Sequence, residues 1–277
     1  MKINSKTQLN MVIGYPLEHS QSPMLHAFSY QLLGINAIFL AQPRLLPLKS
    51  LITVIKTLGI TLTAVTSPFK EKTINYLDQC SDEVKQLQAT NTIIQRDGKL
   101  YGYNTDIDGI NFALRHIAVS NKKVLIIGAG GAARGAAYFL KKNQAQLFWI
   151  NRTSKKATVL AKKFGGNVVT SNELDGLSID IIINTTPFGF YRNVDTSPLP
   201  VYVFNPKQVV FDMVYNPLMT PLLKQAKKQG ANIISGLDMF IGQGLKQIEL
   251  LTGQYLTPTI IKKLRKILIQ DQTATFL

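Results

Sequence analysis

Three short segments combine hydroxyl, ammonium and carboxylate side chains where a strand is expected to end or a helix to begin. They are His19-Ser20-Gln21-Ser22-Pro23, Thr66-Ser67-Pro68-Phe69-Lys70 and Gly102-Tyr103-Asn104-Thr105-Asp106. A lysine beside a carboxylate can move a proton and orient a hydroxyl, and serine hydroxyls can bind a carboxylate. Each residue also has a plain structural interpretation: Ser22 and Asp106 as helix caps, and Lys70 as an exposed lysine.

The most specific local pattern is a glycine turn between a strand and a helix. The apolar run Val124–Ile127 leads into Gly128-Ala129-Gly130-Gly131-Ala132-Ala133 and then into a helical segment. In a G-x-G-x-x-A turn, the first glycine permits a tight bend and the second lets the backbone approach a pyrophosphate, while the small third residue allows close helix–strand packing. Free N–H groups at the helix start bind the anion. The pattern therefore predicts a dinucleotide site.

The residues after the next expected strand favour NADP over NAD. An NAD site usually places Asp or Glu about 20 residues after the glycine turn, where it binds the ribose 2′-OH. Here the chain reads Asn151-Arg152-Thr153-Ser154-Lys155-Lys156, without an acid. The N–H fork of a guanidinium matches phosphate oxygens, so we expect Arg152 to bind the 2′-phosphate of NADP. The alternative is a helix N-cap beside an exposed arginine.

Strand-like and helix-like segments alternate along most of the chain, which predicts an α/β fold with a largely parallel sheet. We expect a first domain at 1–105, on which the helices of 237–277 pack back, and the family resemblance described below implies that it is an open α/β substrate-binding catalytic domain. We expect an NADP-binding Rossmann domain, with a doubly wound parallel sheet, at 106–236. The expected strands are 9–13, 35–41, 59–66, 124–127, 146–150, 180–184, 209–212 and 232–234, with a hairpin joining 92–94 to 100–103. The expected helices are 23–33, 46–57, 70–76, 82–87, one leading from Asp106 to Lys122, 237–251 and 259–269.

Composition favours a soluble globular protein of the cytoplasm. Apolar residues make up 45% of the 277 residues and charged residues 17%, and no apolar run is long enough to span a bilayer. Cys80 is the only cysteine, which excludes a disulfide framework and a cysteine-built metal site, and we expect no metal. The net charge of +15 comes from scattered lysine pairs, which favours solvated helix surfaces and an anionic ligand over nucleic acid.

Taken together, these segments resemble the shikimate dehydrogenase family along nearly the whole chain. The signatures H-S-x-S-P, V-T-x-P-x-K, A-x-N-T, N-T-D, G-A-G-G-A and N-R-T occur in order, followed by Asp212-Met213-Val214-Tyr215 and by Gly236-Leu237-Asp238-Met239 with Gln243. The resemblance implies reversible, NADPH-dependent reduction of 3-dehydroshikimate to shikimate, on the chorismate route of aromatic amino-acid biosynthesis. The chain departs from the family pattern at Ala64 and Ala27, where asparagine is usual, which leaves the preferred ring acid open.

The resemblance also implies roles for individual residues. Lys70 and Asp106 would be catalytic, and whether Asp106 mainly tunes Lys70 or orients the substrate stays open. The substrate contacts would be Ser20, Ser22, Thr66, Asn91, Asp106, Tyr215 and Gln243. The cofactor contacts would be Asp82, Gly128, Ala129, Gly130, Gly131, Ala132, Asn151, Arg152, Thr153, Ser154, Lys155, Lys156, Met213 and Gly236.

Three other functions are considered. A quinate/shikimate dehydrogenase with relaxed cofactor use is expected to carry an acid near Asn151, and the chain has none there. A non-catalytic, small-molecule-binding regulator with the same fold is expected to have lost Lys70 or Asp106, and both are present. A nucleic-acid-binding protein is supported by the net charge alone. We therefore expect a small-molecule substrate and neither nucleic acid nor membrane as partner, and a homodimer is left open.

Overall fold

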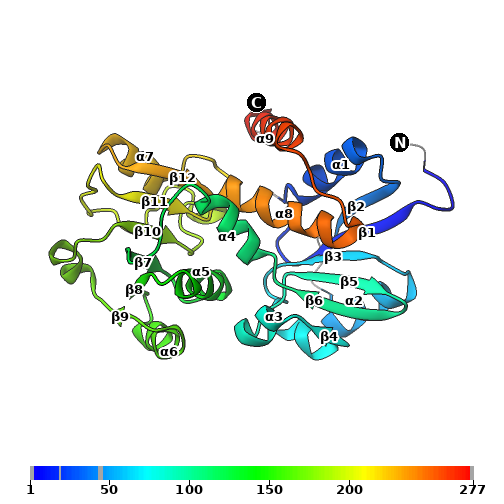
Figure 1. Cartoon of the computed structure of the whole chain (residues 1–277), viewed down its shortest axis with the longest axis horizontal. Coiled ribbons are helices and arrows are strands. Elements are labelled where there is room, and N and C mark those ends of the chain that lie inside the picture. The colour runs from blue at the N-terminus through cyan, green and yellow to red at the C-terminus, as the bar shows by residue number, and fades with distance from the viewer. Residues whose placement is uncertain (1–2, 19, 43–45, 275–277) are drawn as a thin grey trace. The chain divides into compact units, whose positions relative to one another are not determined.

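The computed structural model describes residues 3–18, 20–42 and 46–274, and of residues 175, 192 and 272–274 the backbone alone. The chain divides into two compact units, Met1–Asp108 with Gln243–Leu277, and Gly109–Gly242. The helices α4 (Asp106–Leu114) and α8 (Gly236–Thr252) each run from one unit into the other (Figure 1). The predicted domain limits, 105/106 and 236/237, fall at the starts of these same two helices.

The first unit contains a six-stranded mixed sheet in the order β2-β1-β3-β5-β6-β4. The Asp97-Gly98 turn joins β5 to β6 as an antiparallel hairpin, whereas β1 runs parallel to both β2 and β3. The strands are β1 (Gln8–Ile13), β2 (Ala37–Gln42), β3 (Leu62–Val65), β4 (Gln79–Cys80), β5 (Thr92–Arg96) and β6 (Lys99–Tyr103). The helices are α1 (Ser22–Leu33), α2 (Leu48–Thr57), the 3₁₀ helix η1 (Lys72–Tyr76), α3 (Asp82–Leu87) and α9 (Pro258–Ala274).

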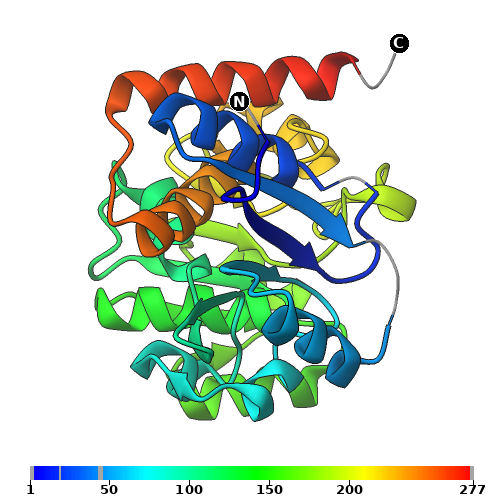
Figure 2. The same ribbon diagram turned by 90° about the vertical axis from the view of Figure 1, so that its right-hand side faces the viewer.

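Helices cover both faces of this sheet. On one face, Ile55 of α2 packs in a buried cluster with Ile13 of β1. On the other face, the His26 ring of α1 stacks on Phe39 of β2 with the ring centroids 3.9 Å apart. The helix α9 runs beside α1, as Figure 2 shows. Alternate residues of each strand therefore serve two different helix layers.

The second unit contains a six-stranded parallel sheet in the order β12-β11-β10-β7-β8-β9. Read by position along the chain, this is the 3-2-1-4-5-6 order of a doubly wound dinucleotide-binding fold, which binds ligands beyond the carboxyl ends of its central strands. The strands are β7 (Lys123–Ile127), β8 (Gln146–Ile150), β9 (Asn167–Val168), β10 (Ile181–Asn184), β11 (Val209–Asp212) and β12 (Asn232–Ser235). The helices are α5 (Gly131–Lys142), α6 (Ser154–Phe164) and α7 (Pro221–Lys228), with 3₁₀ helices η2 (Ser171–Gly176) and η3 (Tyr191–Asn193).

The helix that begins at Asp106 is shorter than predicted, because it ends at Leu114 rather than leading to Lys122. The Ile117 N–H donates to the Leu114 carbonyl at 2.8 Å, and the chain then turns through Asn121, which has a φ of 59°. Asparagine tolerates this left-handed conformation better than most residues. The two-residue strands β4 and β9 were not predicted, since so short a segment shows no periodicity. Within the described residues, no helix is long and apolar enough to cross a membrane.

Asp212, the last residue of β11, is a fully buried carboxylate with three hydrogen-bond donors. It accepts from Asn184 Nδ2 at 2.9 Å, from the Val214 N–H at 3.0 Å and from Thr220 Oγ1 at 2.6 Å. Burial outweighs these donors and raises the pKa of the Asp212 carboxyl from 3.8 to about 6. The ionised form is therefore less favourable in the folded protein than in the unfolded chain.

Asp212→Asn is expected to make folding stability less sensitive to pH. As pH rises from about 4 to about 6, Asp212 loses its proton in the unfolded chain before it does so in the folded protein. The wild type therefore loses folding stability over this range, by about 3 kcal/mol in total for this shift in pKa. Asparagine can accept the same two N–H bonds without a charge. Urea unfolding of both proteins across this pH range measures the difference, with Asp195→Asn as a control for removing an exposed carboxylate. A stability difference that stays constant with pH would contradict the assignment.

Candidate active site

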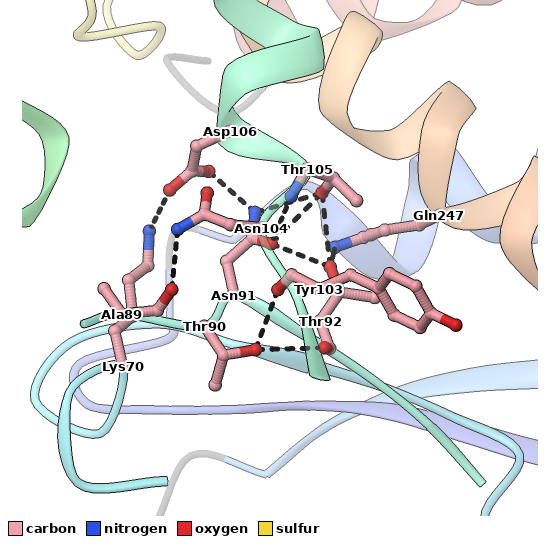
Figure 3. Close-up of polar contacts among 10 residues, drawn as sticks. All are labelled: Lys70, Ala89, Thr90, Asn91, Thr92, Tyr103, Asn104, Thr105, Asp106 and Gln247. Atoms are coloured by element: carbon pink, nitrogen blue, oxygen red, sulfur yellow. Dashed lines mark hydrogen bonds and ion pairs between the residues drawn. The ribbon is translucent and has the colours of Figure 1, made fainter. Parts of the chain in front are cut away.

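Lys70 and Asp106 form an ion pair in the first unit. Lys70 Nζ donates to Asp106 Oδ2 at 2.7 Å, as Figure 3 shows. Lys70 lies between β3 and η1, and Asp106 is the first residue of α4. The two side chains are only 25% and 12% exposed, so Lys70 is not the freely exposed lysine of the plain structural interpretation. An ion pair so shielded from water interacts more strongly than one at the surface.

Asn91 fixes the orientation of the Asp106 carboxylate. The buried Asn91 Nδ2 donates to Asp106 Oδ1 at 2.7 Å and to Thr105 Oγ1 at 3.0 Å. Its Oδ1 accepts from the Thr105 N–H at 2.7 Å and from Thr92 Oγ1 at 2.9 Å. Both the oxygen and the nitrogen of the Asn91 amide are therefore hydrogen-bonded. One carboxylate oxygen of Asp106 accepts from Asn91, and the other accepts from Lys70 (Figure 3).

Backbone hydrogen bonds bring the three segments of this site together. The Val65 N–H, at the end of β3, donates to the Asn91 carbonyl at 2.7 Å, and the Asn91 N–H donates to the Tyr103 carbonyl at 3.1 Å. The Thr90 N–H donates to the Lys70 carbonyl at 2.9 Å. The antiparallel hairpin thus places the start of β5 and the end of β6 beside the end of β3, which positions the catalytic candidates.

The serine-rich segment leads into α1. Gln21 is the N-cap residue and Ser22 is the first residue of the helix, so the N-cap interpretation of Ser22 is wrong. The Ser22 N–H donates to Ser20 Oγ at 3.4 Å, which holds the two predicted substrate residues next to one another. His19 lies outside the described residues.

The other predicted substrate residues lie in both units. Thr66 directly follows β3, and its N–H donates to the Ile13 carbonyl at 2.9 Å. Gln243 lies in α8, in the part that belongs to the first unit. Tyr215 belongs to the second unit, where its ring stacks on Phe240 with the centroids 4.5 Å apart.

The glycine turn after β7 leaves room for a phosphate group. Gly128 has a φ of 113°, and a Cβ there would lie 2.4 Å from Thr185 Oγ1, so both conformation and space require glycine. A Cβ at Gly130 or at Gly131 would meet nothing within 4 Å, so the start of α5 is open. Gly130 is the N-cap of α5 and offers no capping side chain, which leaves first-turn N–H groups for an anion. This turn therefore fits the pyrophosphate of a dinucleotide.

The segment after β8 carries exposed positive charge. Arg152 is the second residue after the strand, and Lys155 and Lys156 lie in the first turn of α6, all three exposed. Thr153 stands at the N-cap of α6, but its side chain makes no capping hydrogen bond. Asn151 Nδ2 donates to the Thr153 carbonyl at 2.9 Å, which holds the loop on both sides of Arg152. Arg152 is thus presented to solvent on a braced loop.

Met213 and Gly236, two predicted cofactor contacts, touch one another in the second unit. A Cβ at Gly236 would lie 2.4 Å from the Met213 carbonyl oxygen, so only glycine fits at the start of α8. Asp82 lies elsewhere, in α3 of the first unit, where its side chain is 82% exposed and pairs with Lys85 at 3.2 Å. The structure therefore groups the first two residues but gives Asp82 a local ion-pair partner.

Two residues of the site were missed by the sequence interpretation. Thr92 belongs to the A-x-N-T signature, in which only Asn91 was singled out. Gln247 carries no local motif, yet its Nε2 donates to Thr92 Oγ1 at 2.9 Å although the residues are 155 positions apart. The sequence offers one signal for it, a second glutamine four positions after Gln243 in the final helices.

Acidic groups near the site do not form a metal centre: among the residues that the structure describes, no group of three or more His, Cys, Asp or Glu could hold an ion. Burial raises the pKa of the Asp108 carboxyl to about 6, and the nearby Lys246 opposes the rise.

Two family models match the chain. Residues 12–93 match the substrate-binding domain of shikimate dehydrogenase, and residues 111–187 match shikimate/quinate 5-dehydrogenase. The first match covers Lys70 and Asn91, and the second covers the glycine turn and Arg152.

Individual relatives match over nearly the full length. The NADP⁺-dependent shikimate dehydrogenase of Methanocaldococcus jannaschii is 41% identical, over 95% of this chain and 100% of its own. A solved shikimate dehydrogenase in complex with NADP⁺ has a TM-score of 0.89 at 38% identity and covers 97% of this chain and 98% of its own. The shikimate 5-dehydrogenase of Thermus thermophilus, solved with NADP(H) and shikimate, has a TM-score of 0.85 at 32% identity over 94% of this chain and 99% of its own.

Proposed function

Because this chain belongs to the shikimate dehydrogenase family, we propose that it catalyses the NADP-dependent, reversible reduction of 3-dehydroshikimate to shikimate, a step of aromatic amino-acid biosynthesis. The observation that carries the proposal is the shielded ion pair of Lys70 and Asp106, whose carboxylate is locked by Asn91. A proton donor and a hydrogen-bond acceptor in fixed geometry are what a carbonyl–alcohol interconversion needs from a protein.

Lys70 is the group that moves the proton. In the direction of reduction, Lys70 Nζ gives a proton to the oxygen that becomes the new hydroxyl, and in the direction of oxidation the neutral amine takes it back. When bound, NADPH would supply the hydride in reduction and NADP⁺ would accept it in oxidation. Asp106 accepts a hydrogen bond from Lys70, holds the ammonium in place and orients a substrate hydroxyl.

The remaining predicted contacts have chemistry that suits the two ligands. Hydroxyls at Ser20, Ser22 and Thr66 can donate to the substrate carboxylate or to its ring oxygens. In the second unit, the open N-terminus of α5 suits the pyrophosphate, and the exposed Arg152 suits the 2′-phosphate. This division assigns most contacts to the ring acid to the first unit and most contacts to NADP to the second.

A quinate/shikimate dehydrogenase with relaxed cofactor use is the second candidate, because one matching family model carries both substrate names. The absence of an acid between Asn151 and Lys156 argues against the use of NAD. Turnover of quinate with NAD as fast as that of shikimate with NADP would favour this alternative. A cytoplasmic location and a homodimeric assembly stay predictions.

Lys70→Ala is expected to lower kcat for NADP reduction by shikimate about 10²- to 10⁴-fold, the usual range for a positioned acid–base group. The KM for shikimate should change much less, since the lost interaction acts in the transition state. Lys72→Ala, two residues along and exposed, is the matched control and should keep wild-type kinetics. Wild-type kcat in the Lys70 variant would remove this lysine from the mechanism, and a wild type without shikimate turnover would refute the proposed function.

Arg152→Ala is expected to weaken NADP binding about ten- to a hundredfold and to leave NAD binding nearly unchanged, because a charge-assisted hydrogen bond to the 2′-phosphate is lost. Lys155 and Lys156 will mask part of the loss. Both cofactors are titrated at one salt concentration, with Lys207→Ala, an exposed lysine that precedes β11 in the other half of the sheet, as the charge-matched control. Equal losses for NAD and NADP would show that Arg152 only holds the loop.

A further inference from the structure

Gln247 of α8 is an almost completely buried amide, 1% exposed, in the first unit. Its Nε2 donates to Thr92 Oγ1 at 2.9 Å, while its Oε1 is buried without a hydrogen-bond partner among the described residues. An amide with one unpaired buried end is costly, and an apolar side chain would pack there without that cost. Packing alone therefore does not explain this residue.

The buried imidazole of His26 lies against the same amide. His26 Nδ1 is 2.9 Å from the Ser22 carbonyl, which can only accept, so Nδ1 carries the hydrogen. Burial lowers the pKa of His26 to about 4, and the Gln247 side chain is among the groups that oppose this shift. The neutral imidazole, stacked on the ring of Phe39, thus lies beside the Gln247 side chain.

The hydrogen bond from Gln247 sets the direction of the Thr92 hydroxyl. Thr92 Oγ1 accepts from Gln247 and donates its own hydrogen to Asn91 Oδ1, 2.9 Å away, which is nearer than its other hydroxyl neighbour, Thr105 Oγ1 at 3.2 Å. Asn91 then donates to Asp106 Oδ1 at 2.7 Å, and Asp106 accepts from Lys70 (Figure 3). The four hydrogen bonds form one continuous chain from α8 to the ammonium group of Lys70.

A small residue lies opposite Thr92 on the neighbouring strand. Ala64 is the cross-strand neighbour of Thr92 in the β3–β5 ladder, so the two side chains share one face of the sheet. Ala64 is also one of the two positions at which the chain departs from the family pattern. The Gln247 amide meets the Thr92 hydroxyl on this face.

We propose that Gln247 is a positioning residue of the active site, whose amide, held beside His26, orients Thr92 and through it Asn91 and the Asp106 carboxylate. The expected effect of Gln247 on kcat rests on the proposed function. The expected effect on the orientation of the Asn91 side chain rests on the geometry alone.

The test is a double-mutant cycle of Gln247→Met and Thr92→Val, with shikimate and NADP. Each single variant should lower kcat about five- to tenfold, the value of one directed hydrogen bond, with the KM for NADP unchanged. Because both act through one chain of bonds, the double variant should lose no more than the worse single variant. Ile248→Val, which removes one buried methyl group from the same helix, is the matched packing control and should keep wild-type kcat.

The crystal structure of Gln247→Met supplies a readout that does not depend on activity. We expect the Asn91 amide to turn away from Asp106 or to occupy two rotamers. The inference would be overturned if the losses of kcat multiplied in the double variant, or if Ile248→Val lost as much kcat as Gln247→Met. An unchanged Asn91–Asp106 hydrogen bond in the Gln247→Met structure would also overturn it. Failure of the proposed function shows separately, as a wild type that does not turn over shikimate.

Discussion

The side-chain amide of Asn91 is the contact on which the site of the first unit depends. Asn91 joins the end of β3, the start of β5 and the start of α4. Its backbone bonds to Val65 and Tyr103, and its side chain bonds to Thr105 and Asp106. A buried amide with both ends paired has one orientation. The carboxylate of Asp106, and with it the position of Lys70 Nζ, follows from that orientation.

The second unit meets a different constraint, which is that backbone rather than side chains must reach the ligand. Gly128, Gly130 and Gly236 each stand where a side chain would collide with a neighbour or fill the space before a helix N-terminus. Side-chain chemistry enters there mainly through exposed cations such as Arg152. A buried polar network thus positions the functional groups of the first unit, whereas glycines that lack a side chain leave the backbone of the second unit open to its ligand.

Local patterns were enough to predict the elements with clear periodicity and the residues with clear chemistry. The glycine turn and the β5–β6 hairpin belong to short motifs whose physical meaning is local, whereas the roles of Lys70, Asn91 and Asp106 were predicted from the family resemblance. What a sequence does not display is contact between distant segments. Gln247 of α8 bonds to Thr92 of β5 although 155 positions separate them, and the end of α4 at Leu114 reflects a turn rather than a loss of helical pattern.

The most direct test of the account is the kcat of Asp106→Asn for NADP reduction by shikimate, measured beside the wild type. The variant keeps the size of the side chain but removes the charge that Lys70 and Asn91 both bind. We predict a fall of about 10²-fold or more, because a misplaced catalytic group costs this much. A variant with wild-type kcat would contradict the claim that the Lys70–Asp106 pair carries the reaction.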